Sequence, residues 1–174
     1  MSKPQSAEPV KLACSILYTE DHFLKDALEK LSGEYGNADF ISQEMPFNYT
    51  NYYAKEMGSV LTRRFVFFEE SIRPEFLPDV KLFSNQVEEK FSVEGLRRVN
   101  IDPGYISKAH LILATGKGYT HRPYLRDGIY ADLTLMYTNR SFQVLPWTYP
   151  DYAEKKIIEM FNKVREKYVH QFRH

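Results

Sequence analysis

Two segments in the second half of the chain alternate apolar and polar residues with a period of two, which is the pattern of β-strands. They cover residues 105–115 and 129–137, and a polar loop that contains glycine, residues 116–128, joins them. Strands that neighbour each other in this way favour an antiparallel sheet. A β-prone run at residues 60–68, VLTRRFVFF, and a short apolar run at residues 11–18 predict two more strands. The pattern therefore predicts a sheet at the centre of the fold.

Helical patterns alternate with these strands. Apolar residues recur at intervals of three and four in residues 20–35, 79–91 and 155–174, as in helices that bury one face. In the second of these helices Lys81 and Leu82 blur the apolar stripe. The order of the elements predicts an α+β fold with a mainly antiparallel sheet and about three packed helices.

The length of 174 residues fits one domain with its own core. We expect residues 11–174 to form this single α+β domain. Residues 1–10 are mostly polar and contain two prolines, so they are expected to form a flexible tail. Residues 38–57 are rich in Tyr and Asn and show no clear period, so the sequence predicts no element there.

The 23 basic residues are balanced by 23 acidic ones. A chain with no net charge has no overall field that attracts nucleic acid or an anionic membrane, so neither partner is predicted and any anion site must be local. The sequence has no secretory signal and no apolar run of about 18 residues, which predicts a cytoplasmic protein. Cys14 is the only cysteine, and its apolar surroundings, LACSIL, predict a small core residue rather than a nucleophile.

Polar residues on the two alternating strands form a first candidate site. If the strands pair directly, Lys108 and His110 share a face with Tyr130 and Asp132. A His beside a carboxylate can act as a general base, and a Lys can stabilise developing negative charge. The alternative is a solvated sheet face with ordinary cross-strand charge pairs.

The loop between these strands, TGKGYTHRPYLRDG, is a second candidate. Its glycines free backbone N–H groups to meet an anion, and its cations suit a phosphate. The alternative is an exposed loop that is basic because loops are polar. The P-loop pattern is not present, and neither are the usual motifs for zinc, a nucleophilic serine or a dinucleotide. The basic side chains of the loop are Lys117, His121, Arg122 and Arg126.

Two further segments carry candidate residues. The run NIDPG, residues 100–104, is typical of a tight turn, and its Asp102 is either a site carboxylate or purely structural. Trp147 lies between two prolines ahead of the last helix. It is predicted to be either the wall of a pocket or a clasp that seats this helix.

Several blocks of the sequence resemble the bacterial and archaeal family catalogued as domain of unknown function 4416. They are MPFNYTNYYAKEMG, RRFVFFE, RRVNIDPGYISKAHLILAT, HRPYL, DGIYADLTL and PWTYPDY. The resemblance extends over about residues 10–170 and implies little about function, although some members carry a GTP-binding label. It implies Asp where this chain has Asn48 and Asn51. The matching blocks imply candidate site positions at Asp102, Tyr105, His121, Arg122, Tyr130 and residues 147–151.

Three hypotheses of function follow. The leading one is a cytoplasmic domain that binds a small anionic ligand, a phosphate or a nucleotide such as GTP. A second is a metal-independent hydrolase or transferase in which His110 or His121 is the base and Asp102 or Asp132 orients it. A third is an interaction module that uses the Tyr-rich surface of residues 47–53. The sequence assigns no metal, cofactor or oligomeric state. The anion pocket would consist of Lys108, His110, His121, Arg122 and Arg126, with walls of Tyr105, Tyr130 and Trp147.

Overall fold

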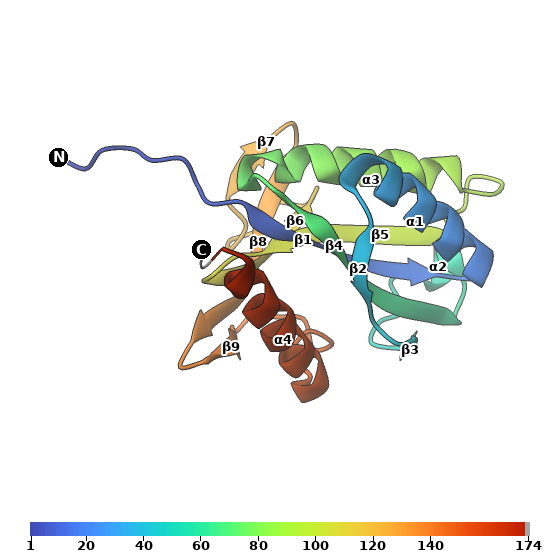
Figure 1. Ribbon diagram of the computed structural model, residues 1–174. Helices are drawn as coiled ribbons and strands as arrows, with labels where there is room; N and C mark the ends of the chain where they lie inside the picture. Colours follow the sequence, from blue (N-terminus) through green and yellow to red (C-terminus); the bar gives the residue numbers. More distant parts are fainter. Residues whose placement is uncertain (173–174) are drawn as a thin grey trace.

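The computed structural model describes residues 1–172 and has one antiparallel sheet of nine strands at its centre. The strand order is β2-β4-β1-β5-β6-β8-β7, with β3 also paired to β4 and β9 to β8. Helices α1 and α3 lie on one side of the sheet, and α4 lies on the other (Figure 1). The predicted α+β fold with a mainly antiparallel sheet and three long helices is confirmed.

The strands follow the predicted runs closely in the first half of the chain, where β1 and β4 take up the two β-prone segments. Residues 38–57, which the sequence left unassigned, contain two short strands and a single helical turn. The strands are β1 Val10–Tyr18, β2 Ala38–Ile41, β3 Met45–Phe47, β4 Leu61–Ile72, β5 Val99–Ile106, β6 His110–Thr115, β7 Tyr124–Arg126, β8 Ile129–Thr138 and β9 Ser141–Val144.

The three long helices also lie where their apolar stripes predicted them. They are α1 Asp21–Tyr35, α3 Leu77–Lys90 and α4 Lys155–Gln171, and the short α2 covers Ala54–Met57. A short 3₁₀ turn at Pro74–Phe76 leads into α3, where the fixed φ of Pro suits a helix start. None of the helices within residues 1–172 is both long and apolar enough to cross a membrane.

Strand β1 is buried along its whole length because it faces a core on each side of the sheet. Its residues Leu12, Cys14 and Ile16 pack against α1 and α3, whereas Ala13 belongs to the core under α4. Burial raises the pKa of the Cys14 thiol to about 12, so this side chain is a neutral core group, as predicted.

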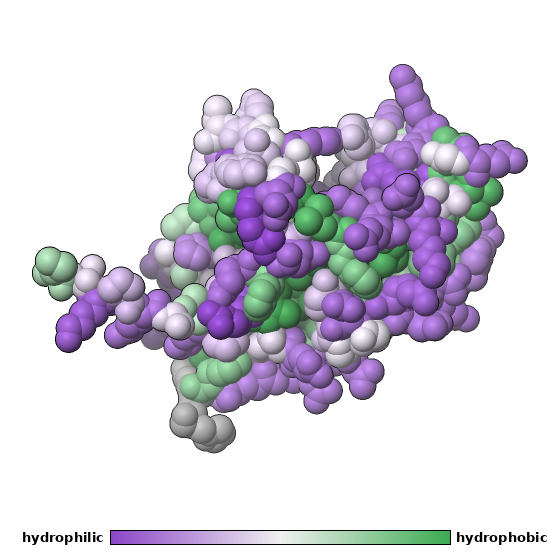
Figure 2. All heavy atoms as spheres, turned by 90° about the horizontal axis from the view of Figure 1, so that it is seen from above, coloured by the Kyte–Doolittle hydropathy of each residue, from purple (hydrophilic) through white to green (hydrophobic). Residues whose placement is uncertain are grey.

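The helical side of the molecule shows the expected division of polar and apolar residues. Figure 2 looks down on the side that carries α1 and α3, and hydrophilic residues cover most of it, with apolar residues visible between them. The buried apolar residues of α1 and α3, such as Leu31 and Val80, belong to the core against the sheet.

Two local predictions in the second half of the chain are wrong. The NIDPG run is not a turn but part of β5, where its residues pair with β1 in an unbroken register. The alternating segment 105–115 is not one strand but the end of β5, a tight connection and β6. In this connection the Ser107 hydroxyl accepts hydrogen bonds from the N–H groups of Ala109 and His110, so a Ser builds a turn that has neither Gly nor Pro.

The predicted cluster on β6 and β8 does not form. Asp132 pairs with Leu113, and His110 pairs with Met136 at the other end of the same ladder. Lys108 lies in the connection before β6 and not on a strand. The assumed pairing fails because its parity is wrong and because a register shift follows Leu111.

Candidate functional site

Strands β5 and β6 pair over a short stretch only, which covers Gly104–Ile106 of β5 and Leu111–Leu113 of β6. Beyond it, β5 stays paired with β1 as far as Val99, and β6 stays paired with β8 as far as Thr115. The sheet therefore has a split, which we define as the gap between residues 99–103 of β5 and residues 114–115 of β6.

The sequence of β5 explains why the ladder stops. The N–H groups of Ile101 and Ser107 both point toward β6. Since every second residue of a strand donates to the same side, residue 103 would also donate toward β6. Proline has no N–H, and the ladder ends beside it. Strand β5 thus keeps a free edge in the middle of the sheet.

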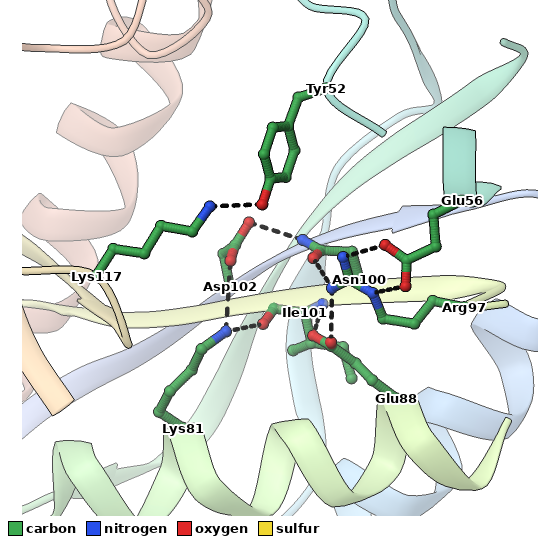
Figure 3. Close-up of polar contacts among 9 residues, drawn as sticks. All are labelled: Tyr52, Glu56, Lys81, Glu88, Arg97, Asn100, Ile101, Asp102 and Lys117. Carbon is green, nitrogen blue, oxygen red and sulfur yellow. Dashed lines mark hydrogen bonds and ion pairs between the residues drawn. The ribbon is translucent and has the colours of Figure 1, made fainter. Parts of the chain in front are cut away.

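Side chains from α3 satisfy this free edge. Lys81 Nζ donates to the carbonyl oxygen of Ile101 at 2.9 Å, and the Ile101 N–H donates to Glu88 Oε1 at 2.6 Å. Figure 3 shows both side chains reaching from α3 to the backbone of the same residue of β5, Ile101. Both residues are buried, so the helix supplies the hydrogen bonds that a neighbouring strand would otherwise provide.

Asp102 stands at the split within a larger polar network. Its Oδ1 lies 3.5 Å from Lys81 Nζ, and its Oδ2 accepts from Asn100 Nδ2 at 2.9 Å. Arg97 in turn donates to Asn100 at 2.8 Å and to Glu88 at 3.0 Å. The Asp102 side chain remains 31% exposed, so the network holds a carboxylate that solvent and ligands can reach.

Charges within this network perturb one another. Burial is the largest influence on Glu88 and raises the pKa of its carboxyl, although Lys81, the Ile101 N–H and Arg97 act to lower it. The hydrogen bonds that Arg97 donates to Glu56, supported by those to Glu88, raise the pKa of Arg97, so its guanidinium stays charged. Both oxygens of Glu56 accept from Arg97 at 2.7 Å, a two-point contact that fixes the guanidinium plane.

A contact between two exposed side chains crosses the split. Lys117 Nζ, from the loop after β6, donates to the Tyr52 hydroxyl at 2.6 Å. Tyr52 belongs to the segment between β3 and α2, and β3 pairs with β4 on the far side of β1. In Figure 3 the two side chains meet on the side of β5 opposite α3, over Asp102.

A second polar group, which we call the histidine cluster, consists of His121, Arg122, Asp132, Trp147 and Tyr149. His121 Nε2 lies 3.6 Å from Asp132 Oδ2, and Arg122 Nε donates to the same oxygen at 2.8 Å. Arg122 also donates to the Tyr149 hydroxyl at 2.7 Å. The imidazole stacks on the Trp147 ring with centroids 4.9 Å apart and an angle of 17°.

Three members of the histidine cluster have largely buried side chains, whereas Trp147 and Tyr149 are exposed. The side chains of His121, Arg122 and Asp132 are 10%, 11% and 5% exposed, and His121 Nε2 has no hydrogen-bond partner among the described residues. Burial acts to lower the pKa of Arg122, but Asp132 and Tyr149 outweigh it, and the pKa is raised. Arg122 therefore stays positively charged, and its ion pair with Asp132 balances the negative charge of the carboxylate beside the imidazole.

The loop after β6 joins the cluster to the split. Arg122 Nη1 donates to the carbonyl oxygen of Lys117 at 3.2 Å, so one loop carries both cations. Tyr130 packs beneath this loop, so closely that a Cβ added at Gly118 would lie 3.0 Å from its ring. A side chain at Gly118 would press against the end of the Tyr130 ring, so glycine favours this close approach of loop and strand.

Trp147 lies in the segment before α4 and contacts β8 and the histidine cluster, not α4 itself. Its Nε1 donates to the carbonyl oxygen of Leu133 at 2.7 Å, which fastens the segment before α4 to β8. Its ring also forms a wall of the histidine cluster. The side chain that seats α4 is instead Tyr152, which stacks on Phe161.

The other predicted site residues lie elsewhere. Lys108, His110 and Tyr105 line a separate hollow of about 260 Å³ near the N-terminal segment, and Lys108 pairs with Glu8. Arg126 forms ion pairs with Asp127 and with Asp79 of α3. The fold therefore does not bring the five predicted basic residues into one pocket: Lys108 and His110 share this hollow, whereas His121 and Arg122 adjoin each other in the histidine cluster.

The Tyr-rich segment, residues 47–53, is partly core. Phe47 is buried against Leu17 and Met57, and Tyr53 packs on the same cluster. Tyr49 and Tyr52 are exposed, so they are the members of the segment that remain available to a partner.

Sequence reasoning missed the residues from α3. Lys81 is buried while its neighbour Leu82 is exposed, the reverse of what their polarity suggests. The interruption of the apolar stripe at these positions was the signal, because a cation on the buried face of a helix requires a polar partner in the interior. Glu88 and Arg97 gave no such signal, since Glu88 pairs with residues outside α3 and Arg97 reaches Glu56 and Glu88 on two helices. Asn100 pairs with Asp102 of its own strand, but the sequence did not show that this segment is a strand.

No group of three or more His, Cys, Asp or Glu side chains within residues 1–172 is placed to hold a metal ion. Neither a curated protein nor a solved structure matches the chain. Residues 8–168 match the family model described as domain of unknown function (DUF4416), and the chain belongs to this family.

Proposed function

We propose that the domain binds a small anionic ligand that carries a phosphate group, such as a nucleotide, at the loop of residues 116–122. The observation that supports this most is that one loop carries both the exposed Lys117 and the permanently charged Arg122. Cations and free backbone N–H groups in a glycine-containing loop are the groups that bind phosphate oxygens.

The surroundings of the loop suit such a ligand. Tyr52, Tyr119 and Trp147 are exposed around it and offer rings on which a planar group can stack. Arg122 uses three of its five N–H donors within the protein, on Asp132, Lys117 and Tyr149, which leaves two for a ligand.

Isothermal titration calorimetry with inorganic phosphate and with GTP tests the proposal. We expect binding to the wild type that Lys117→Ala weakens by about tenfold, the loss of one charge-assisted hydrogen bond. Lys163→Ala is the matched control, because Lys163 is an exposed lysine on α4, and it should leave the affinity unchanged. The proposal is wrong if neither compound binds, or if Lys117→Ala and Lys163→Ala bind equally well.

The distance of 3.6 Å between His121 Nε2 and Asp132 Oδ2 favours a second candidate function, acid–base catalysis. His121 would act as the base of a metal-independent hydrolase or transferase, and Asp132 would orient its ring. Of the predicted His and Asp candidates, these two are the ones that lie within reach of each other.

Hydrolysis of p-nitrophenyl phosphate and p-nitrophenyl acetate tests the second candidate. We expect turnover that falls at least about a hundredfold in His121→Gln, the usual contribution of a general base. Tyr124→Phe, which removes an exposed hydroxyl outside the cluster, should retain the activity. No turnover, or turnover that His121→Gln leaves intact, contradicts this function.

A further inference from the structure

Asp102 is a partly exposed carboxylate that the protein holds in a fixed position. Each of its oxygens has one protein partner, Lys81 on one side and Asn100 on the other. An ionised carboxylate accepts about four hydrogen bonds, so both oxygens keep lone pairs for a donor from outside. The position is ordered in advance by Arg97, which holds Asn100 and is itself held by Glu56. A ligand therefore meets a carboxylate whose side-chain entropy is already lost.

Asp102 also lies close to the proposed phosphate loop. Gly104 pairs with Leu113, so the same register continued by two residues sets Asp102 across the split from Thr115, directly before the loop. The Tyr52–Lys117 contact crosses the split above Asp102 in Figure 3. A ligand whose phosphate lies on the loop would extend its next atoms toward Asp102.

The charges around Asp102 indicate which donors it can bind. The network in Figure 3 contains three cations, Lys81, Arg97 and Lys117, and three carboxylates, Glu56, Glu88 and Asp102. Because the charges balance, the site has no excess negative charge to attract a cationic ligand. Neutral donors remain, and hydroxyl groups are the neutral donors that accompany a phosphate in sugar phosphates and nucleotides.

We propose that the ligand is a sugar phosphate, free or as part of a nucleotide, and that Asp102 accepts hydrogen bonds from its hydroxyl groups. This rests on the proposed function, since it requires the phosphate to lie on the loop of residues 116–122. Asp102 is then the residue that distinguishes a hydroxylated phosphate ester from a simple one.

Calorimetric titration with two probes tests the inference. Ribose 5-phosphate carries hydroxyl groups and methyl phosphate does not, so we expect the wild type to bind ribose 5-phosphate about tenfold more tightly. Asp102→Asn should reduce this difference to about twofold or less and leave the affinity for methyl phosphate unchanged. The control Asp127→Asn, which changes an exposed carboxylate in the turn before β8, should keep the full difference.

The outcomes separate the two proposals. If neither probe binds to the wild type, the phosphate function itself is wrong. If methyl phosphate binds but ribose 5-phosphate has no advantage, or if the advantage survives in Asp102→Asn, only the role of Asp102 is wrong. Circular dichroism checks that Asp102→Asn is folded. If it is not, the comparison of the two probes on the wild type still decides whether the site prefers a phosphate ester that carries hydroxyl groups.

Discussion

Glu88 shows how one side chain can take the place of a strand. It accepts the Ile101 N–H on one oxygen and Arg97 on the other, and it is buried where β5 has no neighbour. A buried peptide N–H without a partner is costly, so the free edge of β5 depends on this carboxylate. The cost of burying Glu88 is visible in its raised pKa, and the bonds it accepts offset that cost.

We predict that Glu88→Ala lowers the free energy of unfolding by about 2–4 kcal/mol, because it leaves the Ile101 N–H unsatisfied and opens a cavity. Urea denaturation measures the loss. Glu89→Ala changes the exposed neighbour on the same helix and should cost less than about 0.5 kcal/mol. Equal losses in the two variants would show that the β5 edge does not need Glu88.

At the scale of elements, the sequence predicted what depends on local pattern. The run 11–18 could be recognised as a strand because it is short and apolar, and α1 and α4 as helices because each carries its own periodicity. The NIDPG run was predicted wrongly, because pairing with β1 over all of β5 outweighs the local turn preference of Asp-Pro-Gly. The sequence could not reveal that Pro103 lies within a strand. The N–H that proline lacks would point toward β6, so its absence does not disturb the pairing of β5 with β1.

Gly104 determines how closely β5 and β6 approach where they do pair. A Cβ at this position would clash with the carbonyl oxygen of Ile112 and lie 2.7 Å from Leu113 Cδ2. We predict that Gly104→Ala destabilises the domain by about 2–3 kcal/mol, because the backbone of β6 must shift to make room. A lower midpoint of urea denaturation would reveal it.

Gly116→Ala is the matched control, since a Cβ there has nothing within 4 Å. It should change the stability by less than about 0.5 kcal/mol. If Gly104→Ala is as stable as this control, the two strands have more freedom to separate than their packing implies.

At the scale of the whole molecule, the candidate site could be predicted only in part. His121 and Arg122 are neighbours in one loop that the sequence singled out, and Trp147 reaches them from a separate segment between two prolines. Asp102 and Lys81 meet through the split, and Tyr52 and Lys117 meet across it. Such contacts join elements that are far apart in the chain, and they depend on strand order, which local patterns do not determine.

Asp39 joins three distant parts of the fold and so connects stability with pH. From β2 it accepts Lys11 of β1 at 2.7 Å and Lys167 of α4 at 3.1 Å. Burial acts to raise the pKa of Asp39, but the two lysines outweigh it and hold the pKa below its ordinary value of 3.8. A lowered pKa in the folded state means that the stabilisation is complete above pH 3.8 and is lost as the pH falls through the folded-state pKa.

We predict that Asp39→Asn lowers the free energy of unfolding by about 3 kcal/mol at pH 7, because the buried Lys11 loses its counter-ion. The difference in free energy of unfolding between the variant and the wild type should shrink as the pH falls below the folded-state pKa of Asp39. The wild-type Asp39 is then protonated and neutral, as Asn is. Urea denaturation at several pH values between 7 and 2 measures it, with Glu166→Gln on the exposed face of α4 as control. A difference that stays constant across this range would mean that Asp39 acts through packing and not through its charge.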